Sequence, residues 1–189
     1  MNQRDKAFHI LKEEISSPRL IKHSLAVEAG MITYAGIFNQ DKDRWAAIGL
    51  LHDIDFEKYP DEHPAKAPSF LEERGYDADF IKAILGHSDQ MKVSRDSLEA
   101  KALYAVDELC SFIVACALVR SPKGFEDMKV KSVKKKLKDK AFARAVSRDI
   151  VAKGAEELGV ELSEHITNLI EGLSRQEEKL RNEGLSLIE

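Results

Sequence analysis

The segment from Leu103 to Val119, LYAVDELCSFIVACALV, constrains the fold most strongly. Its apolar residues predict a long buried helix, within an expected helix at 97–120. Asp107 lies inside this segment, where a buried carboxylate is costly unless it is paired or bound to a metal ion. Pairing with Lys101 or Arg120 would satisfy it, and so would a metal site. The fold must bury this helix and still satisfy the carboxylate.

The rest of the chain also has helical character. It contains no sustained alternation of apolar and polar residues and no Asn-Gly or Asp-Gly turn, which are the usual signals of paired strands. Apolar spacing and helix start and stop signals predict helices at 4–15, 18–38, 43–52, 64–74, 77–85, 97–120, 130–138, 148–158 and 163–181. The sequence therefore predicts an all-α protein.

Length and charge suggest two regions. The chain of 189 residues fits one domain, or one domain with an appendage. We expect a first domain at 1–120 and a helical C-terminal extension at 121–189 packed on it, because the helix pattern breaks at SPKGF and the charge balance changes there. Residues 119–148 contain 11 Lys or Arg and 3 Asp or Glu, a net charge of +8 in a chain whose net charge is −4. This basic block is either a solvated helix face or a surface that attracts an anionic substrate or partner.

Several classes of protein are disfavoured. No apolar run approaches the roughly 18 residues of a membrane-spanning helix, and the N-terminal residues do not resemble a signal peptide. Cys110 and Cys116 would point away from each other on one helix, so we expect no disulfide and a cytoplasmic location. Nucleic-acid binding is not expected, because SVKKKLKDKAFARAV contains a single aromatic residue, Phe142. Nothing in the sequence indicates the oligomeric state.

The histidines divide into two sets. Structural or exposed positions are expected for His9 and His165. The other four are placed on an apolar helix side or at helix ends: His23, His52 followed by Asp53, His63 and His87. Imidazole together with carboxylate suits zinc, manganese, iron and similar ions. With Asp107, these residues predict a metal centre built from several helices.

The order and context of these residues resemble a known family. RLIKHSLAVEA, LLHDID and ALYAVDEL are similar to motifs of the HD superfamily of metal-dependent phosphohydrolases, in an HDIG-like form and in a small bacterial branch. The resemblance covers about residues 18–120. It implies an all-α HD-domain helical bundle with additional C-terminal helices, in which 1–120 is the metal-dependent hydrolase domain.

The resemblance also implies a set of ligands. A first metal ion would be bound by His23, His52, Asp53 and Asp107, and His63 and His87 would bind a second ion with Asp53 as a bridge. The chain departs from the family pattern at two points. Asp55 stands where the signature usually has Gly, and His63 follows His52 after only 11 residues. His63 is therefore either a ligand or a residue that contacts the ligands or the substrate.

The activity implied is cleavage of a phosphoester of a nucleotide or another small phosphorylated metabolite, by attack of a metal-bound water. One or two divalent ions of Zn, Mn, Ni, Co or Fe would be the cofactor. Asp53 would orient the water. Lys66 is the first candidate for a cation that assists and contacts the substrate, and Arg120 and Lys123 are weaker ones.

Two alternative functions fit the same residues. Some relatives of this fold use six ligands and two irons to activate oxygen, and the residues here would allow that if His63 and His87 both bind. A non-catalytic regulatory module that keeps the metal is the other alternative. The presence of all four core ligands argues against simple loss of the site.

Overall fold

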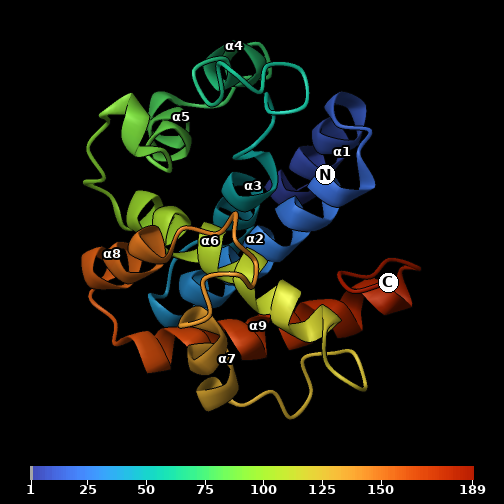
Figure 1. Cartoon of the computed structure of the whole chain (residues 1–189). Coiled ribbons are helices and arrows are strands. Elements are labelled where there is room, and N and C mark those ends of the chain that lie inside the picture. The colour runs from blue at the N-terminus through green and yellow to red at the C-terminus, as the bar shows by residue number, and fades with distance from the viewer. Residues whose placement is uncertain (1) are drawn as a thin grey trace.

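The computed structural model describes residues 2–189, and over these residues the regular secondary structure is entirely helical (Figure 1). The prediction of an all-α bundle is confirmed. The helices, in chain order, are α1 (Gln3–Glu14), α2 (Pro18–Ile37), α3 (Lys42–Leu51), α4 (Ala67–Glu72), α5 (Ala78–Leu85), the 3-10 helix η1 (Asp89–Met91), α6 (Leu98–Leu118), α7 (Val130–Leu137), α8 (Arg148–Leu158) and α9 (Leu162–Asn182).

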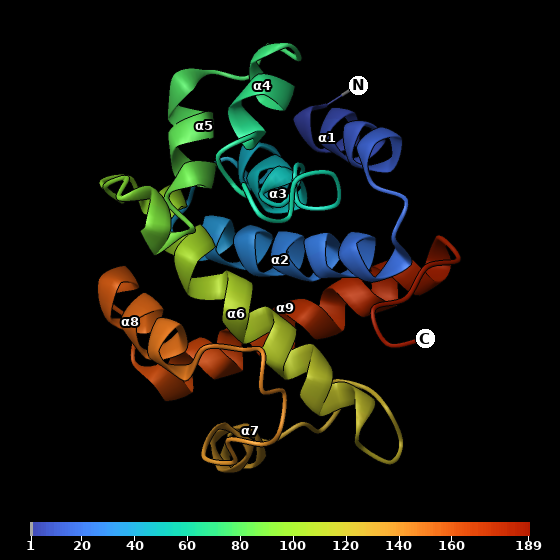
Figure 2. The same ribbon diagram turned by 45° about the horizontal axis from the view of Figure 1, so that its top comes forward.

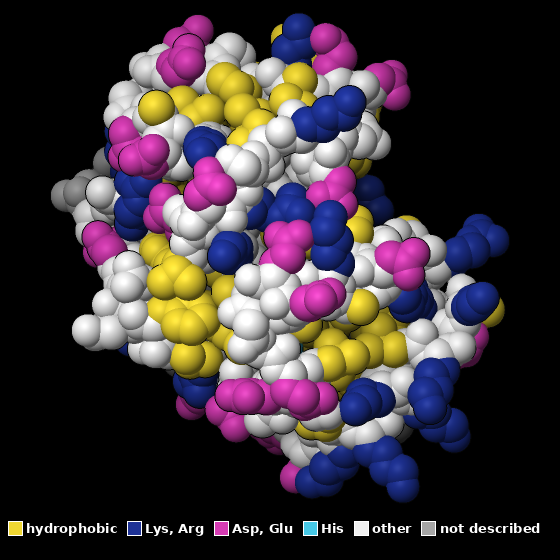
Figure 3. Space-filling view, turned by 90° about the vertical axis from the view of Figure 1, so that its left-hand side faces the viewer, with side chains coloured by type: hydrophobic (Ala, Val, Ile, Leu, Met, Phe, Trp, Pro, Cys, Tyr) yellow, Lys and Arg dark blue, Asp and Glu magenta, His cyan; other side chains and the backbone are white. Residues whose placement is uncertain are grey.

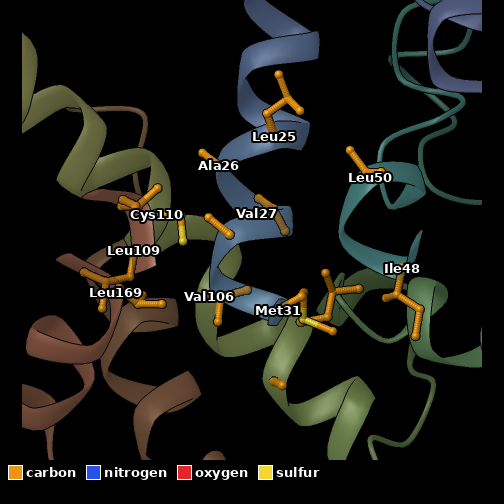
Figure 4. Packing of buried hydrophobic residues seen from close by; sticks show 14 of the residues in the cluster. Leu25, Ala26, Val27, Met31, Ile48, Leu50, Val106, Leu109, Cys110 and Leu169 are labelled. Carbon is orange, nitrogen blue, oxygen red and sulfur yellow. The ribbon is translucent and has the colours of Figure 1, made fainter. Parts of the chain in front are cut away.

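Helix α2 is the centre of the bundle. It packs against α3, α6 and α9, and Figure 2 shows α3 on one side of it and α6 with α9 on the other. In Figure 4, Val27 and Met31 of α2 lie between Ile48 of α3 and Val106 of α6. All four side chains are fully buried, and burial of each contributes about 1.5–3 kcal/mol. The apolar helices predicted from the sequence therefore form one continuous core.

Two glycines let helices cross at very short range. A Cβ at Gly49 of α3 would lie 2.8 Å from the Cα of Glu28 on α2. A Cβ at Gly154 of α8 would lie 2.7 Å from the Cα of Ala105 on α6. Real Cβ atoms essentially never come so close to backbone, so only glycine fits at either crossing. The first crossing fixes the end of α3, where His52 and Asp53 follow, against α2.

The start of α2 is held by the turn that follows α3. Pro18 occupies the first helical position, where its missing N–H costs nothing. Ser17 is the N-cap residue, but its hydroxyl makes no capping bond. The carboxylate of Glu57 instead accepts the backbone N–H groups of Ser16 and Ser17, each at 3.0 Å. This contact ties the segment after His52 to the helix that carries His23.

The segment between α3 and α4 differs from the prediction. A helix was expected at 64–74, but residues 52–66 form successive turns and α4 occupies only Ala67–Glu72. The fully buried carboxylate of Asp55 accepts the backbone N–H of Lys66 at 3.0 Å. This bond folds the segment back on itself, and His63 is brought toward the end of α3.

The helices after residue 120 pack on those before it. Helix α8 lies against α6, and α9 lies against α2 and α6. The division of the chain into domains at residue 120 stays a prediction. Exposed Lys and Arg residues of the basic block lie on and beside α7: Lys129, Lys131, Lys135, Lys138, Lys140 and Arg144. Figure 3 shows Lys and Arg side chains gathered at the lower edge of the face it draws.

Both cysteines are buried and free, as expected. Among residues 2–189, no helix combines the length and apolarity needed to cross a bilayer. The cytoplasmic location stays a prediction.

Candidate metal centre

Six side chains from separate parts of the chain meet in one cluster. His23 comes from the second turn of α2, and His52 and Asp53 follow the last residue of α3. His63 lies in the turns at 52–66, and His87 follows α5. Asp107 comes from α6. The structure thus brings together all six residues predicted as metal ligands.

A first group of potential ligands is formed by His23, His52 and Asp107. The Nε2 atoms of the two histidines are 3.0 Å apart. Oδ1 of Asp107 lies 3.2 Å from Nε2 of His23 and 3.6 Å from Nε2 of His52. Neither Lys101 nor Arg120 pairs with Asp107, so the buried carboxylate in the apolar helix is satisfied by imidazoles.

A second group is formed by Asp53, His63 and His87. The Nε2 atoms of His63 and His87 are 3.1 Å apart. Oδ1 of Asp53 lies 3.2 Å from Nε2 of His63 and 3.6 Å from Nε2 of His87. His63, whose role the sequence left open, points the same nitrogen into the cluster as the other three histidines do.

Asp53 lies between the two groups. Its Oδ2 is 3.3 Å from Nε2 of His23, whereas its Oδ1 faces His63 and His87. Oδ1 also lies 3.3 Å from Nε2 of His52. A carboxylate with one oxygen toward each group has the arrangement required to bridge two metal ions.

The spacing of the donor atoms fits metal coordination. Bonds of about 2.0–2.2 Å from zinc to nitrogen or oxygen, at tetrahedral or right angles, place neighbouring donors about 2.8–3.6 Å apart. The contacts within the two groups run from 3.0 to 3.6 Å. Mixed imidazole and carboxylate donors suit zinc, manganese, iron, cobalt and nickel. The residues therefore fit one or two divalent transition-metal ions.

The opposite nitrogen of each histidine is held by a second partner. The partners of the four Nδ1 atoms are Ser111 Oγ for His23 (3.0 Å), Gly49 O for His52 (2.8 Å), Asp55 Oδ1 for His63 (2.7 Å) and Ile84 O for His87 (2.5 Å). Carbonyl and carboxylate oxygens only accept hydrogen bonds, so in the last three histidines Nδ1 carries the proton. Their Nε2 lone pairs are left to bind a cation, as in histidines that ligate metals.

The charges within the cluster favour a bound cation. Burial by itself raises the pKa of Asp107, but the nearby imidazoles of His52 and His23 lower it well below its usual range. Burial by itself also raises the pKa of Asp53, but the same two imidazoles outweigh it and lower this pKa. Burial lowers the pKa of His23, but the carboxylates of Asp107 and Asp53 outweigh it and raise the pKa to about 10. The cluster thus holds two ionised carboxylates that attract positive charge.

Lys66 and Arg120 lie outside this cluster of ligands. The Lys66 ammonium pairs with Glu62 at 3.0 Å, and its side chain is 42% exposed. The Arg120 guanidinium donates to the carbonyl oxygens of Gly124 and Glu126, so it holds the loop after α6. Lys123, the weaker candidate, is exposed in that loop. Their predicted roles toward the substrate stay predictions.

The two remaining histidines lie apart from the metal centre, whereas Asp55 contacts it. His9 is exposed and lies 3.2 Å from Glu13, and His165 is buried against Tyr34 and the carbonyl of Ala105. Neither belongs to the cluster. Asp55, which the sequence did not predict as part of the site, is the hydrogen-bond partner of His63.

A comparison with family models agrees with this geometry. Residues 20–111 match the model of the HD domain. The chain contains an HD domain. HD-domain proteins bind divalent metals and are typically metal-dependent hydrolases. The matched HD residues run from the second residue after the start of α2 to Ser111 and include all six members of the cluster. Neither the curated proteins nor the solved structures yielded a match to the chain.

Proposed function

We propose that this HD protein is a metal-dependent phosphohydrolase that acts on a small phosphorylated metabolite. The observation that supports the proposal is the pair of ligand groups joined through Asp53, whose Oδ2 lies near His23 of the first group and whose Oδ1 lies near His63 of the second. A divalent ion bound in such a site lowers the pKa of coordinated water toward neutrality and polarises phosphoryl oxygens.

The residues of the cluster have separable roles. His23, His52 and Asp107 would hold one ion, and His63 and His87 would hold the other. Asp53 would fix the distance between the two ions. The hydrogen bonds to the Nδ1 atoms keep the imidazoles oriented before any ligand binds, which reduces the reorganisation needed at the moment of reaction.

Lys66 remains the first candidate for a cation that contacts the phosphoryl group. Its backbone N–H is bonded to Asp55, which also holds His63, so the base of the side chain is fixed beside the cluster. The exposed ammonium pairs only with exposed Glu62 at 3.0 Å, a contact worth little in solvent. Substrate would therefore compete with Glu62 for this lysine.

The first test is metal content together with hydrolysis. We expect protein purified without added metal, then loaded with Mn, Zn, Co or Ni, to hydrolyse phosphomonoesters. Asp53→Asn should abolish turnover and lower metal content, whereas His9→Gln, at an exposed histidine outside the cluster, should do neither.

The alternatives predict different results. Two irons per chain with oxygen consumption, and no hydrolysis, would favour an HD-fold oxygenase, because four imidazoles and two carboxylates also suit two irons. Metal binding with no turnover of any ester under any metal would favour a regulatory module.

A further inference from the structure

A pocket of about 400 Å³ adjoins the metal centre on the side of His23. It is a groove between α2 and α6, and the C-terminal residues close one side of it. His23 and its hydrogen-bond partner Ser111 both line it. Its volume falls within the about 300–1,000 Å³ of typical small-molecule sites.

One face of α6 leads from the metal centre to the groove. Asp107, Ser111, Val114 and Leu118 follow one another at spacings of four, three and four residues, which places them on the same side of a helix. Asp107 is a candidate ligand, and the other three line the pocket. From Asp107 at the metal centre to Leu118 at the rim, this face of α6 is about 16 Å long, because a helix rises 1.5 Å per residue. A molecule held at the metal centre can therefore extend into the groove.

The walls of the groove are apolar. Ala26, Val114, Leu118, Leu187 and Ile188 line it, and Leu118 is 40% exposed. Contiguous apolar side chains in a concave site are a feature of ligand-binding grooves. Ser111, the one hydroxyl of the lining, is already bonded to His23. Few groups are left that would recognise a sugar or a nucleobase through hydrogen bonds.

The C-terminal wall of the groove is buried and is held by hydrogen bonds to α9. Leu187 and Ile188 are 2% and 3% exposed. The Glu177 carboxylate on α9 accepts the backbone N–H of Leu187 at 2.7 Å and the Ser186 hydroxyl at 2.7 Å. The wall thus comes from outside the residues that match the HD domain, and it is anchored to α9.

Positive charge lies at the mouth. Arg19 and Lys22 precede His23 on the same face of α2 and line the pocket. The Lys22 ammonium donates to the backbone carbonyl of Glu189, whereas the structure records no ion pair or hydrogen bond for the Arg19 guanidinium within residues 2–189. Glu189 also lines the pocket and offsets part of this charge, so the Arg19 guanidinium is the cation that favours a ligand with both an apolar group and an anion.

We propose that this groove holds the organic group of the substrate, and that the substrate is a phosphoester of an apolar alkyl or aryl alcohol. The inference rests on the proposed function, because the phosphoryl group would lie at the metal centre. Binding energy from the apolar group would then position the phosphoryl group for reaction.

The test uses two phosphonates that cannot be hydrolysed, naphthylphosphonate and methylphosphonate. Calorimetric titration of the metal-loaded protein should show naphthylphosphonate binding about 10-fold or more tightly, because only its ring buries apolar surface in the groove. Leu118→Glu should remove that preference. Val119→Glu, a neighbouring exposed position that does not line the groove, should keep it. Metal content and circular dichroism should be unchanged in both variants.

A second variant guards against indirect effects of the added charge. Val114→Trp fills the groove without charge and should also remove the preference for naphthylphosphonate. Equal affinity for both phosphonates in the native protein, or equal behaviour of Leu118→Glu and Val119→Glu, would overturn the inference even if small esters are hydrolysed. A retained preference without hydrolysis of any ester would support the groove and overturn the proposed function instead.

Discussion

The carboxylate of Asp55 accepts a hydrogen bond from Nδ1 of His63 at 2.7 Å. The other oxygen of the same carboxylate accepts the backbone N–H of Lys66 at 3.0 Å. Asp55 is fully buried, and within residues 2–189 these two bonds compensate its carboxylate for leaving water. Asp55 therefore orients a histidine of the second ligand group.

We predict that Asp55→Asn selectively weakens metal binding at the second group. The amide keeps the size of the side chain but loses the charge that increases the basicity of His63, and such changes next to metal ligands reduce affinity about 10–100-fold. Metal titration followed by elemental analysis should show one weakened ion and one unchanged ion. Asp61→Asn, an exposed acid in the same segment, is the matched control. Two ions of native affinity in Asp55→Asn would contradict the role given to Asp55.

Much of the fold was predictable because apolar spacing indicates helices directly. The spacing predicted the positions of α2, α6, α8 and α9 within about two residues, and Asp107 signalled a polar site inside an apolar helix. The segment at 52–66 was not predictable in the same way. Its turns depend on the buried carboxylate of Asp55, and no local pattern indicates that an acidic residue after a His-Asp pair is buried.

The role of His63 could not be predicted for the same reason, because it depends on how the turns at 52–66 fold. The separation of 11 residues between His52 and His63 does not determine the distance between their side chains. A segment of successive turns folds back on itself, whereas a helix would carry His63 away. The partners of Lys66 and Arg120 were also beyond prediction, since long cationic side chains reach several acceptors from one backbone position.

Gly49 links the packing of the bundle to the metal centre. A Cβ there would lie 2.8 Å from the Cα of Glu28, and the Gly49 carbonyl accepts the Nδ1–H of His52. We predict that Gly49→Ala pushes α3 away from α2, lowers the free energy of unfolding by about 1–3 kcal/mol and weakens metal binding. Urea unfolding and metal titration measure the two effects.

Gly36→Ala is the matched control for that substitution. Gly36 lies in α2, and a Cβ there would meet only the end of the Lys42 side chain at 3.4 Å. Alanine at this helical position should leave stability unchanged or raise it by about 0.5–1 kcal/mol. If both alanine variants behave alike, the close crossing of α2 and α3 is not what positions His52.

Arg4 forms an ion pair with the carboxylate of Glu28 in the core. Its Nε donates to Glu28 at 2.6 Å, and the Glu28 side chain is 0% exposed. Arg4→Met should lower the free energy of unfolding at pH 7 by about 3 kcal/mol, because it leaves a buried carboxylate with only the Gln176 amide as partner. Arg175→Met, which breaks an exposed pair with Glu171, should change stability by less than about 0.5 kcal/mol.

The loss in Arg4→Met should depend on pH in a defined direction. Burial raises the pKa of Glu28, so its folded form binds a proton more readily than the unfolded chain does. Stability that depends on this proton is present at low pH and falls as the pH rises through the raised pKa. Urea unfolding at pH 5 and pH 7 should therefore show a smaller loss at pH 5. A loss that grows on acidification would contradict this reading of the buried carboxylate.

His165 should make the protein sensitive to acid. Tyr34 donates its hydroxyl proton to Nδ1 at 2.5 Å, and Nε2 donates to the Ala105 carbonyl at 3.0 Å, so the neutral ring joins α2, α9 and α6. Burial lowers its pKa, so the unfolded chain binds a proton that the folded one does not, and stability falls as the pH drops below about 6.5. His165→Gln should be less stable at pH 8. Its deficit relative to the native protein should then shrink by up to about 1.4 kcal/mol per pH unit on acidification, measured by urea unfolding. A difference between His165→Gln and the native protein that stays constant over this pH range would rule out the buried neutral ring.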